Sequence, residues 1–308
     1  MLKVLRLDIS TYQKKDFQAK ERALVEKLGF SSLSTLDFDA DILISNSNTE
    51  FHKIKPSEFK NLKLLIHPNS GYDNITLEWA KQNTTPVIVG HEIRMNAVIE
   101  YSLSCLLGHF ASPPFVKRWD KGRAWERKLL RDQTIQLIGY GHIGKVLKES
   151  LAPIVKKVFV YDPYKNQNEQ HPEQCDVLMM AASLNPSSEK IINADFLKKL
   201  PSHALIINGA RGRLIDQNAL VDFLKTSNDA YAYLDVFENE PADFSPFDQL
   251  NNVKLCSHVA GVYSALDAGI LNFEEKVLGD FSRLKIDEFK AKYAEENLQN
   301  RIHNNYIL

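Results

Sequence analysis

The sequence predicts an α/β fold made of two units, each with a parallel sheet covered by helices. Short β-branched or leucine-rich runs alternate with segments of helical spacing almost from end to end. The stretch 111–127 interrupts this rhythm with two prolines, a glycine and mixed charges, and a second alternating series follows it. Alternation of this kind is typical of parallel sheets with helices on both faces. We therefore expect two such units in one chain, with a ligand in the cleft between them.

Each predicted strand is a short apolar run, and each predicted helix has apolar residues three or four positions apart. The first series has predicted strands at Val4–Leu7, Asp41–Ile44, Lys63–Ile66 and Val87–Val89, and helices at Lys15–Leu28 and Ile75–Lys81. The second series has predicted strands at Thr134–Ile138, Lys157–Tyr161, Asp176–Met180, Leu205–Ile207, Tyr231–Val236 and Val253–Cys256, and a helix at Ile143–Leu151. After Gly261 we expect the chain to be helical, with a charged tail from Lys285.

Composition excludes several classes of protein. The 308 residues can form one large or two modest domains, and 44% hydrophobic with 25% charged residues excludes a disordered chain. The formal net charge is −1, so neither nucleic acid nor a membrane surface is expected as a partner. The three cysteines are widely spaced and form no CxxC pair, so we expect neither a disulfide framework nor a metal site.

Two apolar stretches could be mistaken for targeting or membrane segments. Residues 1–8 carry charge inside their apolar run and therefore predict a first strand rather than a signal peptide. The most apolar long stretch, Val98–Phe110, contains Glu100 and His109 and is too short to span a bilayer. Together these features predict a protein of a reducing compartment, the cytoplasm.

A glycine loop follows the predicted strand Thr134–Ile138 and opens a helix. Gly139 permits a tight turn, Gly141 lets the backbone approach a pyrophosphate, and Gly144 lets helix and strand pack closely. The N-terminus of the helix offers unpaired N–H groups and a positive dipole end to phosphates. This context predicts a dinucleotide-binding site.

Asp162 ends the next strand, about twenty residues after the loop, where the dinucleotide fold places the carboxylate that bonds the adenosine ribose. The alternative is that this acid only starts a turn with Pro163. An acid at this position would repel a 2′-phosphate, so the sequence favours NAD over NADP.

Three segments with chemically useful side chains follow three further strands. They contain Arg211, Glu240 and His258, and because the carboxyl ends of parallel strands face the ligand crevice, all three can converge on the nicotinamide. Taken singly, each has an ordinary interpretation: a solvated arginine, a Glu-Pro turn and a polar strand cap. Their joint occurrence downstream of a nucleotide loop favours a shared site.

These motifs resemble the NAD-dependent D-2-hydroxyacid dehydrogenase family over most of the chain. The resemblance rests on the glycine loop and on the segments Asn69–Ile75, Asn96–Glu100, Asn208–Gly212, Leu234–Pro241 and Ser257–Gly261. It implies Rossmann-like and flavodoxin-like domains, with the nucleotide domain (97–262) inserted into a substrate domain built from 1–96 and 263–308. It also implies a homodimer formed largely through the cofactor domains.

The resemblance implies a role for each matching residue. Arg211 would bind the substrate carboxylate and polarise the C2 carbonyl, His258 would be the acid–base residue, and Glu240 would be its partner. The Ser70-Gly71 backbone would also hold the substrate carboxylate. The residues implied to bind the cofactor are Gly139, Gly141, His142, Ile143, Gly144, Asp162, Ser183, Ser188, Gly209, Ala210, Asp235, His258 and Gly261.

The chain also departs from the family pattern. Ala181-Ala182-Ser183 stands where the family commonly has His-Cys-Pro, Ser188 replaces a frequent Thr, and Ser257 replaces the Pro before the histidine. These differences affect the expected shape of the cofactor loops rather than the chemistry.

The resemblance implies an enzyme that transfers a hydride between NAD(H) and C2 of a small 2-hydroxy or 2-oxo acid, with D specificity. Formate dehydrogenases are similar but pair the histidine with Gln, so Glu240 argues against that branch. The alternative is an NAD-sensing corepressor or scaffold on the same fold, with little or no turnover. The particular acid is not determined by the sequence.

Overall fold

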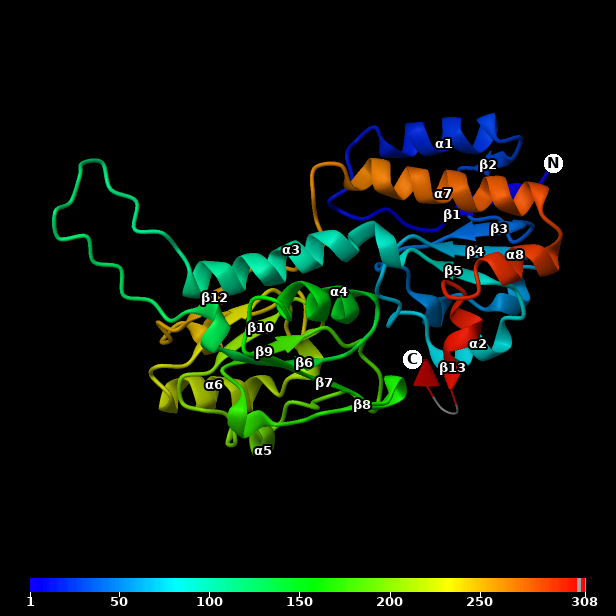
Figure 1. The fold of residues 1–308 in the computed structure, drawn as a ribbon. Helices are drawn as coiled ribbons and strands as arrows, with labels where there is room; N and C mark the ends of the chain where they lie inside the picture. Colours follow the sequence, from blue (N-terminus) through cyan, green and yellow to red (C-terminus); the bar gives the residue numbers. More distant parts are fainter. Residues whose placement is uncertain (304–305, 308) are drawn as a thin grey trace. The chain divides into compact units, whose positions relative to one another are not determined.

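The computed structural model describes residues 1–303 and 306–307, and the chain divides into two compact units (Figure 1). Unit 1 comprises Met1–Met95 and Val262–Leu308, and unit 2 comprises Asn96–Gly261. Unit 2 is therefore inserted into unit 1, and each unit has its own largely parallel sheet, which confirms the predicted fold class. Of the predicted range 263–308, residues 304, 305 and 308 lie outside the described residues.

The sheet of unit 1 has five parallel strands in the order β2-β1-β3-β4-β5. These strands are β1 (Lys3–Arg6), β2 (Ser31–Leu33), β3 (Ile42–Ile44), β4 (Leu64–His67) and β5 (Val87–Val89). The helices are α1 (Phe17–Lys27), α2 (Leu77–Gln82), α7 (Leu266–Arg283) and α8 (Ile286–Lys292). Helices α1 and α7 lie side by side over one face (Figure 1), where Phe17 and Phe273 join a core with Ile42 and Ile66. Trp79 of α2 packs in a second core on the other face.

The sheet of unit 2 has seven strands in the order β12-β11-β10-β9-β6-β7-β8, and β8 alone runs antiparallel to its neighbour. These strands are β6 (Thr134–Ile138), β7 (Lys157–Asp162), β8 (Gln167–Asn168), β9 (Val177–Met180), β10 (Leu205–Asn208), β11 (Tyr231–Leu234) and β12 (Val253–Leu255). The helices are α3 (His91–Phe110), which begins in unit 1, α4 (His142–Leu151), α5 (Ala194–Leu197) and α6 (Gln217–Thr226). Figure 1 shows α4 on one face of this sheet and α5 and α6 on the other.

The predicted strands and helices are present, with ends within two residues of the predicted ones. The expectation of a helical remainder after Gly261 is wrong at the end of the chain. After α8 the chain forms a short antiparallel ribbon of β13 (Ile302–His303) and β14 (Tyr306–Ile307). Before the ribbon lies a short 3₁₀ helix (Leu298–Arg301), and the side-chain oxygen of Asn297, just before that helix, accepts from the backbone N–H of Val87 in β5 at 3.2 Å. A helical pattern in the local sequence could not reveal that tertiary contact.

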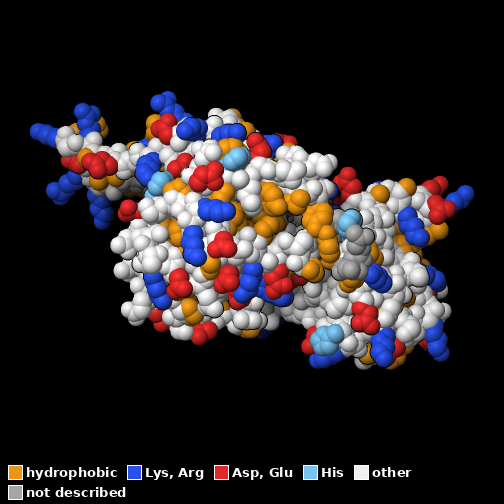
Figure 2. All heavy atoms as spheres, turned by 90° about the horizontal axis from the view of Figure 1, so that it is seen from below, with side chains coloured by type: hydrophobic (Ala, Val, Ile, Leu, Met, Phe, Trp, Pro, Cys, Tyr) orange, Lys and Arg blue, Asp and Glu red, His pale blue; other side chains and the backbone are white. Residues whose placement is uncertain are grey.

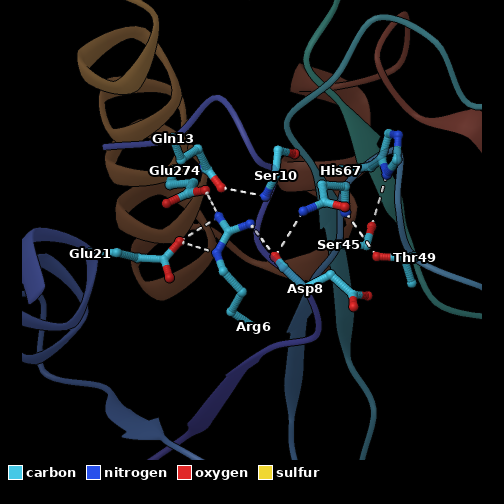
Figure 3. Close-up of polar contacts among 10 residues, drawn as sticks. Arg6, Asp8, Ser10, Gln13, Glu21, Ser45, Thr49, His67 and Glu274 are labelled. Atoms are coloured by element: carbon cyan, nitrogen blue, oxygen red, sulfur yellow. Dashed lines mark hydrogen bonds and ion pairs between the residues drawn. The ribbon is translucent and has the colours of Figure 1, made fainter. Parts of the chain in front are cut away.

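Unit 1 contains a buried group of three ionisable side chains, Arg6 from β1, Glu21 from α1 and Glu274 from α7 (Figure 3). The guanidinium of Arg6 donates from Nε to Glu21 at 2.5 Å and from Nη2 to Glu274. Burial raises the pKa of Glu274 well above its ordinary value; the charge of Arg6 lowers it, and nearby Glu21 raises it further. The group therefore ties two helices to the first strand without reaching solvent.

Within the described part of the chain, no helix has both the length and the apolar composition needed to cross a membrane.

Candidate active site

The glycine loop lies between β6 and α4 in unit 2, as predicted. Gly139 has a φ of 99°, a conformation that other residues rarely adopt, and a Cβ atom there would lie 2.5 Å from the backbone nitrogen of Ala182. A Cβ atom at Gly144 would overlap the carbonyl oxygen of Gly139, so this glycine permits close packing of helix and turn. A Cβ atom at Gly141, in contrast, would meet no protein atom within 4 Å. The chain therefore leaves space where a pyrophosphate would approach the loop.

Asp162, at the end of β7, holds this loop and the turn after the strand. Its Oδ2 accepts from the backbone N–H of Tyr140 at 2.8 Å, and its Oδ1 accepts from that of Tyr164 at 3.1 Å. The carboxylate thus caps the turn Pro163–Lys165, as the alternative interpretation of the sequence proposed, and it also reaches the glycine loop. Each carboxylate oxygen has further lone pairs, so these contacts are compatible with a ribose ligand.

The predicted cofactor residues Ser183 and Ser188 belong to one turn after β9. The hydroxyl of Ser188 donates to the carbonyl of Ser183 at 2.7 Å and accepts from the N–H of Asn185 at 2.9 Å. Ser188 is buried, and its hydroxyl stabilises the turn through these two hydrogen bonds.

The N-terminus of α4 fits an anionic ligand. The residue preceding α4 is Gly141, which has no side chain to cap the first N–H groups of the helix. The N–H groups of His142 and Ile143 therefore face the space beside Gly141 with the positive end of the helix dipole behind them. The residues present thus fit the pyrophosphate of a dinucleotide.

His258 and Glu240 form the hydrogen-bonded pair that the sequence predicts. Nδ1 of His258 lies 2.6 Å from Oε2 of Glu240, while Oε1 of Glu240 accepts from the N–H of Phe237 at 3.0 Å. Because a carboxylate only accepts, Nδ1 carries the proton of this bond, and Nε2 is the ring nitrogen that can serve a ligand. The two side chains keep 50% and 35% of their surface exposed. The imidazole is thus oriented by the protein and still accessible.

The charge state of Glu240 follows from its surroundings. Burial by itself raises the pKa of Glu240, but hydrogen bonds from His258 and Phe237 and the charge of Arg211 lower it below its ordinary value. Glu240 is therefore a carboxylate at neutral pH and favours positive charge on the imidazole.

Asp235 fixes the backbone that carries His258. It is fully buried, and its two carboxylate oxygens accept from the N–H groups of Val259 and Ala260, each at 2.8 Å. The N–H of His258 donates to the carbonyl of Asp235 at 2.7 Å, and His258 has a φ of 54°, in the left-handed region. A non-glycine residue persists in that region only where its surroundings hold it, and such positions cluster at functional sites.

Arg211 follows β10 on a turn shaped by Asn208. The side-chain amide of Asn208 donates to the carbonyl of Arg211 at 2.9 Å, and its oxygen accepts from the N–H of Ala210 at 3.1 Å. A Cβ atom at the next residue, Gly212, would overlap the backbone of Phe237. The turn with Arg211 therefore packs closely against the segment that leads to Glu240.

Ser70 and Gly71 lie in unit 1, in the loop after β4. The hydroxyl of Ser70 donates to the carbonyl of His91 at 3.1 Å. The carbonyl of Gly71 accepts from Nε2 of buried His67 at 2.9 Å, and Nδ1 of His67 then accepts from the hydroxyl of Ser45 at 2.8 Å (Figure 3). A buried histidine thus fixes the loop that is predicted to hold a carboxylate.

In unit 2, His258 is in direct contact with Glu240. Arg211 also acts on this pair, because its positive charge lowers the pKa of Glu240. The predictions did not include the supporting residues Asn208, Phe237 and His67. An Asn at the end of a strand indicates a turn in which the amide bonds the backbone, and this signal could have identified Asn208. The contacts of Phe237 and His67 depend on backbone groups, for which the sequence carries no signal.

The family described as "D-isomer specific 2-hydroxyacid dehydrogenase, NAD binding domain" matches residues 116–260. This stretch of the chain is similar to the NAD-binding domain of that family. The match covers β6 to β12, and with them the glycine loop, Asp162, Arg211, Glu240 and His258. It agrees with the family and the cofactor that the sequence predicts.

Three known proteins illustrate this similarity. The chain is 28% identical over 233 residues to D-3-phosphoglycerate dehydrogenase of Methanocaldococcus jannaschii, covering 70% of this chain and 44% of the relative. It is 28% identical over 251 residues to erythronate-4-phosphate dehydrogenase of Wigglesworthia glossinidia brevipalpis, covering 77% and 62%. The chain thus spans less than two thirds of the length of both relatives. The NAD⁺-bound 3-phosphoglycerate dehydrogenase of Entamoeba histolytica shares the fold, with a TM-score of 0.72, 20% identity, and coverage of 92% of this chain and 97% of that one.

Proposed function

We propose that the protein is an NAD(H)-dependent oxidoreductase that interconverts a 2-oxo acid and the D isomer of the 2-hydroxy acid. The observation that carries the proposal is the His258–Glu240 pair at 2.6 Å, which follows the carboxyl ends of strands in the same sheet as the glycine loop. A hydrogen-bonded imidazole and carboxylate beside a dinucleotide site can act as an acid–base catalyst. The two relatives quoted above are named as dehydrogenases, which favours an enzyme over an NAD sensor.

The cofactor-binding roles fall to residues of unit 2. The glycine loop with the N–H groups of His142 and Ile143 would hold the pyrophosphate, and Asp162 would bond the adenosine ribose. When bound, the nicotinamide supplies or accepts the hydride. The other residues proposed to contact the cofactor are Ser183, Ser188, Gly209, Ala210, Asp235 and Gly261.

The protein's own task is to move one proton and stabilise one negative charge. In the direction of reduction, His258 donates the proton on Nε2 to the C2 oxygen of the substrate, and Glu240 stabilises the imidazolium through Nδ1. Arg211 stabilises the developing charge on that oxygen and binds the substrate carboxylate with its planar guanidinium. The backbone of Ser70 and Gly71 completes the binding of the carboxylate. In oxidation His258 takes the proton back, so reduction is favoured at acidic pH and oxidation at basic pH.

A homodimer is the expected assembly, and one segment of unit 2 supports it. Residues 111–129 carry no helix or strand and extend from unit 2 as a long arm (Figure 1). Phe115 and Trp119 on this arm are 91% and 78% exposed. Figure 2 shows Lys and Arg side chains gathered on the arm. Large aromatic side chains exposed on one segment favour an interaction surface, and the proposed occupant is a second copy of the chain. Sedimentation should give a dimer for the wild type and a monomer for Trp119→Ser with Phe115→Ser.

A reducing compartment, the cytoplasm, suits this proposal because all three cysteines are unpaired thiols.

The decisive experiment is a coupled assay of NADH consumption with a panel of short 2-oxo acids. Turnover that is lost in a His258 variant supports the proposal. Tight NADH binding without turnover of any 2-oxo acid would contradict it and favour a sensor.

A further inference from the structure

A hydrogen bond joins the two turns that flank the glycine loop in unit 2. The hydroxyl of Tyr164 donates to the hydroxyl of Ser187 at 2.8 Å. Tyr164 lies in the turn Pro163–Lys165 after β7, and Ser187 lies in the turn after β9. In the sheet, β6 lies between β7 and β9 and is parallel to both, and the glycine loop follows β6. The bond therefore connects the neighbours of the loop on both sides, at the carboxyl edge of the sheet.

Each end of this bond is held by its own turn. The N–H of Tyr164 donates to Oδ1 of Asp162 at 3.1 Å. The hydroxyl of Ser187 donates to Oδ1 of Asn185 at 2.7 Å, and the N–H of Ser187 donates to the same oxygen at 2.9 Å. Because the single proton of the Ser187 hydroxyl is directed at Asn185, this hydroxyl accepts from Tyr164. The bonds thus run in one direction, from Tyr164 through Ser187 to Asn185.

The position of the bond relates it to the adenosine end of the cofactor site. Tyr164 is two residues after Asp162, which is proposed to bond the adenosine ribose. Ser187 directly precedes Ser188, which is also proposed to contact the cofactor. The acid–base pair follows β11 and β12, which lie on the far side of β9 and β10 from the glycine loop. Since the side chains of Tyr164 and Ser187 are both exposed, their bond lies at the rim of the adenosine end.

We propose, resting on the cofactor-binding part of the function proposed above, that Tyr164 and Ser187 form a clasp for the adenosine end of NAD(H). The bond keeps the turns after β7 and β9 at a fixed spacing before the ligand arrives. A site that already has its bound shape loses less conformational entropy on binding, so its ligand binds more tightly. Tyr164 and Ser187 are positioning residues in this proposal, and the class of ligand is an adenosine nucleotide.

The test is a double-mutant cycle that is read by binding and not by turnover. The variants are Tyr164→Phe, Ser187→Ala and the two together, each titrated with NADH, ADP-ribose and reduced nicotinamide mononucleotide. ADP-ribose has the adenosine but no nicotinamide, and the mononucleotide has the nicotinamide but no adenosine. Each single variant should raise the Kd of NADH and of ADP-ribose about 3- to 10-fold, as for the loss of one hydrogen bond. The Kd of the mononucleotide should stay the same.

The double variant should bind ADP-ribose about as tightly as the weaker single variant, because both substitutions remove the same bond. The matched controls are Tyr231→Phe, at the start of β11, and Ser202→Ala, just before β10, both at the amino edge of the same sheet. The controls should leave all three Kd values unchanged. Because the bond lies at the surface, the clasp variants and the controls should have the same melting temperature.

Four outcomes would overturn this inference. They are an unchanged Kd of ADP-ribose in both single variants, a lower Kd, an equal rise in the Kd of the mononucleotide, and effects that add in the double variant. A lower Kd would mean that the bond must open before the ligand enters. Failure of the proposed function is a separate result, namely intact NADH binding without turnover of any 2-oxo acid, and it leaves these Kd values measurable. A wild type that binds none of the three ligands would overturn both.

Discussion

Two groups of charged side chains in this protein use similar residues for different purposes. In unit 1, Arg6 lies between Glu21 and Glu274, and the side chains are 8%, 8% and 0% exposed. In unit 2, His258 contacts Glu240, and half of the histidine side chain is exposed. The first group joins β1 to α1 and α7, whereas the second follows the ends of strands beside a nucleotide loop.

The difference in burial determines what each group can do. A buried charge pair cannot exchange protons readily with solvent or reach a ligand, and removing one partner leaves a charge that is costly to bury. An exposed pair contributes little to stability, but its proton can be transferred. We therefore expect substitutions in unit 1 to change the free energy of unfolding and substitutions in unit 2 to change turnover.

The largest effect is expected for His258→Asn. Asparagine tolerates the left-handed backbone at this position, so the loop should keep its shape. Without the acid–base group, kcat for reduction of a 2-oxo acid should fall about 10²- to 10⁴-fold. Fluorescence titration should show nearly unchanged NADH affinity, and the melting temperature should stay the same. Turnover at the wild-type rate would end the assignment of His258.

Arg6→Met should have the largest effect in unit 1. It leaves Glu21 and Glu274 without their shared cation, and the loss of one partner of a buried ion pair costs about 3–5 kcal/mol. Denaturant unfolding measures this loss, and Arg22→Met on the exposed side of α1 should change stability by less than about 0.5 kcal/mol. A loss equal to that of the control would show that the buried group is not important for stability.

Glu240→Gln should have an intermediate effect on turnover. Glu240 is ionised because its pKa is lowered, despite burial, by His258, Phe237 and Arg211, so its negative charge helps to keep the proton on the histidine. In the proposed mechanism reduction uses that proton, so kcat/KM at neutral pH should decrease about tenfold in the variant.

The pH profiles of kcat/KM for the variant and the wild type measure this decrease. Glu238→Gln is the matched control, because Glu238 pairs with Lys190 at 3.1 Å and is not part of the proposed site. Profiles of Glu240→Gln and wild type that coincide would contradict the role of Glu240.

The smallest effect is expected for Glu274→Gln. Burial raises the pKa of Glu274, so the folded protein keeps this proton to higher pH than the unfolded chain does. The wild type should therefore lose stability as the pH rises from the ordinary carboxyl range through the raised pKa. The variant cannot ionise at this position and should be about 1 kcal/mol more stable than the wild type at alkaline pH.

Unfolding at several pH values measures this difference, with Glu275→Gln on the same helix as an exposed control. A variant that is less stable than the wild type at alkaline pH would indicate that the ionised carboxylate is needed by Arg6.

The site in unit 2 could be predicted because its parts follow a rule of topology. Arg211, Glu240 and His258 each come after a run that the sequence identifies as a strand, and parallel strands bring their carboxyl ends to one edge. The pairing of Glu240 with His258 needed the family resemblance in addition. Neither source indicated that both oxygens of Asp235 are bonded to the backbone after His258, since such contacts depend on the path of a loop.

The buried group in unit 1 could not be predicted in the same way. Arg6 and Glu274 are 268 residues apart, and their contact depends on α7 lying beside α1 after unit 2 has been completed. Glutamate is typical of solvent-exposed helix positions, and only the packing of α7 shows that Glu274 faces the core. The same holds for Tyr164 and Ser187, which are 23 residues apart and meet only because β7 and β9 lie on either side of β6 in one sheet.

The central claim is that the His258–Glu240 pair supplies the proton for a hydride transfer to C2 of a 2-oxo acid. Its most direct test is reduction of a 2-oxo acid panel with NADH, followed by chiral analysis of the hydroxy acid formed. The account predicts NADH consumption that matches product formation, a D product, and loss of both in His258→Asn. An L product, or consumption that persists in His258→Asn, would contradict it.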